Sequence, residues 1–359
     1  MTKSNTPSSP SKSFRKTARI SVKPCCFAKL ASSSSDSSPM TISSPIKDEN
    51  FLNLTTPTPP HHILPKPHNL MYSGDELDTA LEGASMPNKT VIIAIVNKAY
   101  TEGDKPMLDI FLDGFWLGED TRQLTNHLLI VAVDQTAFER CKFLRLHCYK
   151  LKMDGGDFVR EKLYMSEDFI KMMWQRTRFL KEVLQRGYNF VFTDTDVLWL
   201  RDPFPRLSLI NETLDLQISV DRFNGNQWSD KHPINTGFYM IRSNSKTISL
   251  FNEWYAQRNN STGKKEQDVL FELMSKGAFT RLGLRVRFLD TIFFSGFCQD
   301  SRDVNVVATV HANCCRSIKA KVTDLTAVIH DWKTFNDPSY NKTIGFRWSN
   351  HFGCKHSWK

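Results

Sequence analysis

The chain has 359 residues, of which 40% are hydrophobic and 24% are charged, and its formal net charge is +9. This composition supports a sizeable core and excludes a fibrous protein, a small disulfide-stapled domain and a wholly disordered chain. The charges are interspersed and form no basic run in the second part of the chain. The excess positive charge therefore favours a basic pocket for a phosphorylated small molecule, and no nucleic-acid partner is expected.

Residues 1–88 are expected to form a disordered tail or stem. They are rich in Ser, Thr and Pro, and the first glycine of the chain is Gly74. Such a segment buries too little apolar surface to offset the entropy of ordering it. The first 35 residues are basic and contain no acidic residue, which is typical of an organelle transit peptide or of a basic tail. The longest apolar runs have six residues, far fewer than the roughly 20 of a transmembrane helix.

Residues 89–359 are predicted to form one folded α/β unit, because strand-like and helix-like segments alternate along them. The predicted elements of its first half are strands at 90–96, 127–133, 147–151 and 188–193, and helices at 108–118, 137–144 and 166–186. In the last of these helices, Ser166 is a plausible N-cap and Gly187 follows the C-terminus. This half is predicted to be Rossmann-like.

The second half of the unit has a mixed pattern. Its predicted elements are strands at 216–220, 237–241 and 306–310, and helices at 245–257 and 266–274. We interpret it as the second half of one mixed domain.

Asp194 and Asp196 directly follow the buried strand at 188–193. Alternation along an extended backbone places both carboxylates on one side, and ligands bind at the carboxyl ends of such strands. Hard oxygen ligands of this kind suit Mg²⁺ or Mn²⁺, which can bridge a diphosphate. The alternative is structural, with Asp194 capping a turn and Asp196 pairing with Arg201.

The eight cysteines form no CxxC pair, so neither a zinc ribbon nor a thioredoxin-type site is expected. Six of them lie in the folded unit, which allows the disulfides of an oxidising compartment but does not require them. N-x-S/T sequons occur at residues 53, 88, 211, 259, 260 and 341, and they support a secretory compartment.

Six ordered motifs carry a resemblance to a known family. They are FVFTDTDVLWLRDPF (190–204), INTGFYMIRSN (234–244), KKEQDVLFE (264–272), LDTIFFSGFCQDS (289–301), HANCCRSIKAKVTDL (311–325) and HDW (330–332). With these motifs the chain resembles the plant nucleotide-diphospho-sugar transferases of glycosyltransferase family 77, and most closely their uncharacterised plant clade. The resemblance implies a GT-A fold, a divalent metal (Mn²⁺ or Mg²⁺), a UDP-sugar donor, and transfer with retention to a polysaccharide or glycoprotein acceptor.

The resemblance also implies a metal site and a diphosphate contact. Asp194 and Asp196 would be metal ligands, and His311 would be the third ligand, with His330 as its rival. A lysine after His311 would meet the diphosphate, and both Lys319 and Lys321 are candidates.

Other residues are candidates for donor binding. Thr195 lies between the two acids, and Asn97 and Asp134 follow the first two strands, where a Rossmann-like half meets its nucleotide. Arg176 and Arg178 precede the DxD strand. They are two residues apart on a helix, so at most one of them faces the pocket.

Two motifs are candidates for contacts with the donor sugar and for catalysis. Asn235 can exchange hydrogen bonds with a sugar, and Gly237 allows close approach of the backbone. In the next motif Gln267 is a candidate for sugar contact. Asp268 and Glu266 are candidates for stabilising a cationic transition state, although acids also favour the first turn of a helix.

Four further residues complete the prediction. Asp221 is expected to support the site from behind. Trp199, Trp228 and Trp332 could stack on sugar rings; Trp199 is expected in the core, whereas Trp228 in a polar loop is the better candidate for an acceptor contact.

The sequence thus predicts a metal-dependent retaining glycosyltransferase, with a cell-wall acceptor implied by the family. One alternative is a phosphatase of the haloacid dehalogenase type, because DTDVL loosely resembles its loop. The other is a scaffold that binds nucleotide sugars or glycans without turnover. The family and the sequons favour the Golgi lumen, and the transit-like start leaves a plastid as the alternative. The oligomeric state is left open.

Overall fold

The computed structural model describes residues 74–153, 160–162, 164–207, 214–340 and 345–358. Residues 1–73, which make up most of the predicted tail, lie outside the described residues. No helix within the described ranges is long and apolar enough to cross a membrane.

Helix α1 (Glu76–Ala84) lies within the segment that was predicted to be a tail. The Asp75 carboxylate caps it by accepting a hydrogen bond from the Asp78 amide, and its apolar side chains are buried. Arg186, at the end of another helix, forms ion pairs with Asp75 and Asp78 at 2.7 and 2.6 Å. The folded part therefore includes α1, and the predicted boundary at residue 89 is too late.

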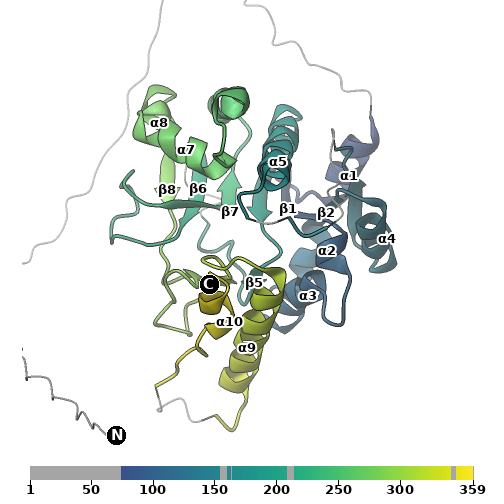
Figure 1. Ribbon diagram of the computed structural model, residues 1–359, viewed down its shortest axis with the longest axis vertical. Coiled ribbons are helices and arrows are strands. Elements are labelled where there is room, and N and C mark those ends of the chain that lie inside the picture. Colours follow the sequence, from purple (N-terminus) through teal and green to yellow (C-terminus); the bar gives the residue numbers. More distant parts are fainter. Residues whose placement is uncertain (1–73, 154–159, 163, 208–213, 341–344, 359) are drawn as a thin grey trace, which may run out of the picture. The chain divides into compact units, whose positions relative to one another are not determined.

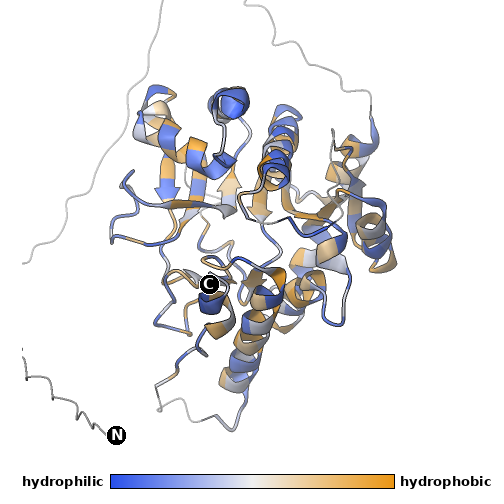
Figure 2. Cartoon of the chain, in the orientation of Figure 1, coloured by the Kyte–Doolittle hydropathy of each residue, from blue (hydrophilic) through white to orange (hydrophobic). Residues whose placement is uncertain are grey.

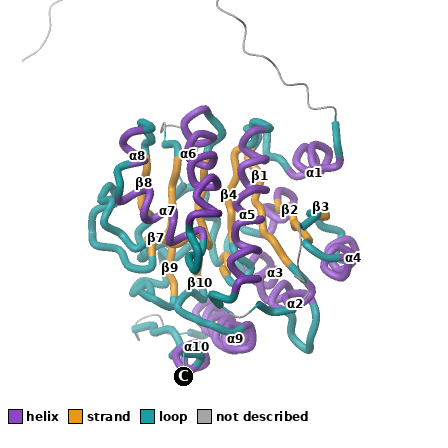
Figure 3. The backbone as a smooth tube through the Cα atoms, turned by 45° about the horizontal axis from the view of Figure 1, so that its top comes forward, coloured by secondary structure: helices purple, strands orange, loops and turns teal. Residues whose placement is uncertain are grey.

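Seven strands form the main sheet in the order β3-β2-β1-β4-β7-β6-β8 (Figure 3). They are β1 (Thr90–Val96), β2 (Leu128–Ala132), β3 (His147–Lys150), β4 (Asn189–Thr193), β6 (Leu216–Val220), β7 (Ile234–Ile241) and β8 (Val286–Phe288). Strands β3, β2, β1 and β4 are parallel, whereas β7 is antiparallel to both β4 and β6. The parallel strands form the Rossmann-like half that the alternating pattern predicts.

Helices cover both faces of this sheet (Figure 1). Helices α1, α5 (Glu167–Gln185), α6 (Ser245–Ala256) and α7 (Glu266–Ser275) share a core with one face of the sheet. Helices α3 (Met107–Leu117) and α4 (Gln135–Phe143) share a core with the other face. Side chains of β1 alternate between the two cores, as its continuous apolar run predicts. Figure 2 shows the apolar strands lying between helices whose outer faces are hydrophilic.

The ends of α5 follow the predicted signals. The Ser166 hydroxyl accepts a hydrogen bond from the Phe169 amide, and Gly187 after the helix has a φ of +82°. The shorter elements are α2 (Lys98–Thr101), α8 (Ala278–Arg281) and the 3₁₀ helices η1 (Arg122–His127) and η2 (Gln257–Asn260).

A second sheet of three strands has the order β5-β10-β9, formed by β5 (Val197–Trp199), β9 (Phe294–Gly296) and β10 (Thr309–His311). Strand β10 is shorter than the predicted strand at 306–310, and His311 is its last residue. The long helix α9 (Ile318–Asn336) follows, capped by the Ser317 hydroxyl. The two lysine candidates, Lys319 and Lys321, therefore lie in the first turn of a helix.

All six cysteines of the described part are paired. The disulfides join Cys141 to Cys148, Cys298 to Cys314, and Cys315 to Cys354 in the short helix α10 (Phe352–His356). The adjacent residues Cys314 and Cys315 are thus bound to two different segments of the chain.

Candidate functional site

Polar residues meet at one edge of the main sheet. Asn97, Asp194 and Asp221 directly follow β1, β4 and β6, which run in the same direction. Strand β7 is antiparallel, so its first residues, Asn235 among them, lie at the same edge. The reversal of β7 brings residues far apart in the sequence to one place.

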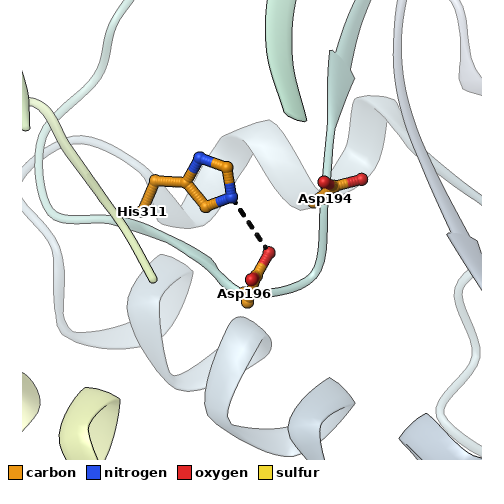
Figure 4. Close-up of side chains that lie close together, drawn as sticks. All are labelled: Asp194, Asp196 and His311. Carbon is orange, nitrogen blue, oxygen red and sulfur yellow. Dashed lines mark ion pairs between the residues drawn. The ribbon is translucent and has the colours of Figure 1, made fainter. Parts of the chain in front are cut away.

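Asp194, Asp196 and His311 form a cluster at this edge, with one ligand atom of each within 4.8 Å of the others (Figure 4). The pairing of β5 with β10 creates it, because His311 lies opposite Val197, the residue after Asp196. His311 Nε2 is 3.3 Å from Asp196 Oδ1. The Ala312 amide donates a hydrogen bond to the Asp196 carbonyl and fixes this register.

Lys321 forms an ion pair with Asp196. Its Nζ is 2.7 Å from Asp196 Oδ2, from the first turns of α9. Burial alone would raise the pKa of Asp196, but Lys321 and His311 outweigh burial and hold that pKa well below its usual range. Burial would likewise lower the pKa of His311, but Asp196 raises it. The proposed alternative pairing of Asp196 with Arg201 is wrong, since Arg201 pairs with Glu119 at 2.7 Å.

Arg176 of α5 links Asp194 to two other elements. It donates hydrogen bonds to Asp194 at 3.0 Å, to the Thr236 hydroxyl at 3.2 Å and to Glu266 at 2.5 Å. Burial raises the pKa of Asp194 despite the nearby guanidinium. Of the two arginines of α5 considered for the donor, Arg176 faces the site, but carboxylates already occupy its guanidinium.

Gly237 and Asn235 shape the wall opposite the cluster. A Cβ on Gly237 would lie 2.5 Å from His311 Cε1 and 2.7 Å from Asp194 Oδ2, so only glycine fits there. Asn235 donates to Asp221 at 2.8 Å and accepts from the Gly237 amide at 2.8 Å. Asp221 also accepts a hydrogen bond from Asn313 at 2.9 Å, so it holds the side chains of Asn235 and Asn313 in place.

The cluster fits a divalent cation. Two carboxylates suit Mn²⁺ or Mg²⁺, and the imidazole favours Mn²⁺ of the two. Because residue 237 is a glycine, no side chain fills the space beside His311 and Asp194; we call this position the glycine cradle. The geometry therefore agrees with the predicted metal site.

A cavity of about 270 Å³ extends from this cluster. It brings together most of the predicted site residues. Those that line it are Asn97, Arg176, Asp194, Thr195, Asp196, Asn235, Gly237, Glu266, Gln267, His311 and Lys321. Gln267 accepts a hydrogen bond from the Thr236 amide at 3.1 Å, which turns its side chain toward β7.

Two candidate residues, Asp134 and Asp268, accept hydrogen bonds from backbone amides at the starts of helices. The Asp134 carboxylate caps α4 by accepting from the Ala137 amide at 2.9 Å, and it also accepts from the Lys98 amide at 2.6 Å. Asp268 accepts from the Lys265 amide at 3.3 Å at the start of α7. Val133, Glu266 and Gln267 line the cavity, whereas Asp134 and Asp268 do not, so the structure does not bring these two candidates to the site.

Two more candidates lie on the outer side of α9. Lys319 and Lys321 are two residues apart on this helix, so they face different directions, and Lys319 is exposed. His330 is also exposed and lies nine residues beyond Lys321, about 13 Å along the axis. Neither Lys319 nor His330 joins the cluster.

The tryptophans divide as expected only in part. Trp199 is buried in the core, as predicted, and Trp332 is buried there too. Trp228 is exposed but lines a separate cavity, together with Phe223 and Arg287. Trp228 thus lies apart from the cavity that holds the metal cluster, and its contact with the acceptor stays a prediction.

Several residues that line the cavity were not predicted from the sequence. Tyr100 lies on α2, and burial raises its pKa to about 12. Tyr164 and Trp358 also line the cavity, although they lie far from every motif in the sequence. Asn313 could have been suspected, because it follows His311 by two residues in the same motif.

Comparisons with known proteins agree with this geometry. A family model described as nucleotide-diphospho-sugar transferase matches residues 123–325. An uncharacterized protein of Arabidopsis thaliana is 57% identical and covers 80% of this chain and 85% of its own length. The beta-arabinofuranosyltransferase RAY1 of the same plant is 24% identical over 61% of this chain and 41% of its own length.

Among solved structures, the galactosyltransferase LgtC with donor and acceptor sugar analogues is similar to this chain. It has 15% identity and a TM-score of 0.38, and the match covers 66% of this chain and 95% of that one.

The family model covers more than half of this chain, and the sheet has the mixed α/β arrangement of the predicted GT-A type. The resemblance to family 77 is confirmed, and the phosphatase alternative is wrong. The chain belongs to the nucleotide-diphospho-sugar transferase family and is a glycosyltransferase.

Proposed function

We propose that this glycosyltransferase is metal-dependent, uses a UDP-sugar and transfers the sugar with retention of its anomeric configuration. The observation that carries the proposal is the cluster of Asp194, Asp196 and His311 on the wall of the cavity. These three side chains would hold the cation, which when bound would neutralise charge on the donor diphosphate.

Two basic residues have different parts in this proposal. Lys321 ends beside Asp196, next to the cation site, so it can also offset charge on the leaving diphosphate. Arg176 is a positioning residue, because its guanidinium is already bound to Asp194 and Glu266. It fixes the orientation of one metal ligand.

The sugar would lie near Gln267 and Asn235, with Gly237 allowing close approach of the backbone. In the transfer step, the bond between the anomeric carbon and the diphosphate oxygen breaks. The acceptor oxygen bonds to the anomeric carbon on the same face, and its hydroxyl proton passes to the leaving diphosphate. No residue is assigned as a nucleophile, because a front-face route needs none.

The relatives support a proposal for the substrates and the compartment. Curated relatives are named as an arabinofuranosyltransferase, a xylosyltransferase and a galactosyltransferase, so UDP-pentoses and UDP-galactose are the donors to test. A cell-wall polysaccharide or glycoprotein is the corresponding acceptor class. The three disulfides and the sequons support the secretory pathway, with the Golgi lumen as the proposed site of action.

The test combines metal binding with donor turnover. Mn²⁺ binding is measured by calorimetry, and hydrolysis of UDP-xylose, UDP-arabinose and UDP-galactose is measured with and without Mn²⁺. Asp194→Asn, Asp196→Asn and His311→Ala should each weaken Mn²⁺ binding at least about tenfold. The matched controls Asp104→Asn and His330→Ala change exposed residues and should bind Mn²⁺ as the wild type does.

Two results would overturn the proposal. One is metal-dependent turnover that survives the double change Asp194→Ala and Asp196→Ala. The other is a wild-type chain that binds the donors but neither hydrolyses nor transfers them, which would favour the scaffold alternative.

A further inference from the structure

Four residues form an aromatic and basic rim on the same cavity as the metal cluster. This rim consists of Tyr164, Lys265, Arg316 and Trp358. The Arg316 guanidinium lies 4.3 Å from the centre of the Trp358 ring, and the Lys265 ammonium lies 5.3 Å from that of Tyr164. The two aromatic rings are themselves 6.3 Å apart.

Trp358 is held in place although it lies near the end of the chain. Its Nε1 donates a hydrogen bond to the Cys314 carbonyl at 2.8 Å, three residues after His311. The Arg316 amide donates to the Ser357 hydroxyl at 3.0 Å, and the Cys315–Cys354 disulfide ties the same two segments together. The indole is thus oriented, yet 48% of its surface is exposed.

The rim lies beside the residues proposed for the donor sugar, and its aromatic side chains are too exposed to belong to the core. Lys265 lies two residues before Gln267, which is proposed to lie near the donor sugar, and both residues line the cavity. Core packing does not explain an ordered indole and phenol that are both exposed, at 48% and 37%. The same apolar faces suit the C–H face of a sugar ring, and the cations beside them suit its hydroxyl groups.

We propose that Trp358 and Tyr164 form the subsite for the acceptor saccharide, with Arg316 and Lys265 as hydrogen-bond donors to its hydroxyl groups. This inference rests on the proposed function, because it places the acceptor next to the donor sugar. It also assigns a role to the C-terminal segment, which carries none of the family motifs.

The chain offers a closely matched control. Trp116 is 54% exposed, and Arg122 lies 4.3 Å above its ring, so it repeats the geometry of Trp358 at another surface. Trp358→Ala, Trp358→Phe and Trp116→Ala are compared in the full chain. Transfer is measured with the methyl glycosides of galactose, xylose, arabinose and fucose, and binding of these glycosides is measured by saturation-transfer NMR.

Trp358→Ala should raise the KM for the glycoside at least fivefold and should raise the KM for the donor by a smaller factor. Trp358→Phe should retain part of the affinity, because it keeps an aromatic face, and Trp116→Ala should behave as the wild type. A larger rise in donor KM than in glycoside KM would overturn the subsite and assign the ring to the donor.

The NMR measurement separates this inference from the proposed function. A wild-type chain that turns over no UDP-sugar contradicts the function, while loss of glycoside binding in Trp358→Ala still supports the subsite. Absence of glycoside binding to the wild type, or equal binding to Trp358→Ala, overturns the subsite.

Discussion

Replacement of Arg176 by methionine should destabilise the protein strongly. The Arg176 side chain is 8% exposed and that of its partner Glu266 is 1% exposed, so the pair is almost fully removed from water. Among the described residues, Glu266 Oε2 is buried without a hydrogen-bond partner, so loss of the guanidinium leaves an uncompensated charge. Removing one member of a buried pair costs about 3–5 kcal/mol. In a folded part of about 280 residues that corresponds to a fall in Tm of about 5–8 °C.

Urea unfolding followed by circular dichroism gives the free energy of unfolding of Arg176→Met, Glu266→Gln and the double variant. The double variant should lose less stability than the sum of the two single variants, by about 1–3 kcal/mol, because its glutamine needs no counter-charge. Lys171→Met, at an exposed position of the same helix, is the control and should change stability by less than about 0.5 kcal/mol. A loss below about 1 kcal/mol in Arg176→Met, or strict additivity, would refute the reasoning.

Three further predictions concern pH, the disulfides and the glycine cradle. Burial alone would raise the pKa of Asp215, but its hydrogen bonds to backbone and side-chain amides and its ion pair with a lysine lower that pKa. The stabilisation that the ionised carboxylate gives to the fold is therefore complete above the ordinary pKa of about 3.8, and it is lost as the pH falls through the lowered pKa. Asp215→Asn should therefore lower stability at pH 7 and flatten its loss toward pH 2 in urea titrations, and unchanged acid dependence would contradict this. Cys354→Ser removes a disulfide with a sequence separation of 39 and should lower the free energy of unfolding by about 4 kcal/mol. Cys148→Ser removes one with a separation of 7 and should cost only about 2 kcal/mol, because a shorter loop restricts the unfolded chain less. Equal losses in urea unfolding would contradict this reasoning. Gly237→Ala should weaken Mn²⁺ binding, because the added methyl group would lie 2.5 Å from His311 and 2.7 Å from Asp194. Gly345→Ala, where a methyl group meets no atom within 4 Å, is the control and should bind Mn²⁺ as the wild type does. Calorimetry measures the binding of both variants.

Six of the seven strands of the main sheet could be predicted because they leave strong local signals, whereas the three-residue strand β8 was not predicted. The apolar run at 90–96 and the capped helix that begins after Ser166 appear where expected, with small shifts at their ends. Helix α1 was missed because it has only nine residues and is stabilised by distant contacts with Arg186. Local composition carries no signal of such contacts.

The metal cluster could be proposed from motifs, but its neighbours could not all be chosen. Lys319 and Lys321 have the same chemistry in the sequence, and only the helical turn of α9 directs Lys321 toward Asp196. Asp134 follows a strand as Asp194 does, yet the amides at the start of α4 take up its carboxylate. Backbone donors at helix starts compete for such acids, and the sequence does not show which use prevails.

The two disulfides at Cys314 and Cys315 affect the order in which the site can be built. During synthesis the parallel strands can pair early, because all four lie before residue 194. The bridge to Cys354 waits until that residue has left the ribosome and met an oxidant. The cavity wall near His311 is therefore completed late in biosynthesis, and a nascent chain can hold a finished sheet before it can hold its substrate.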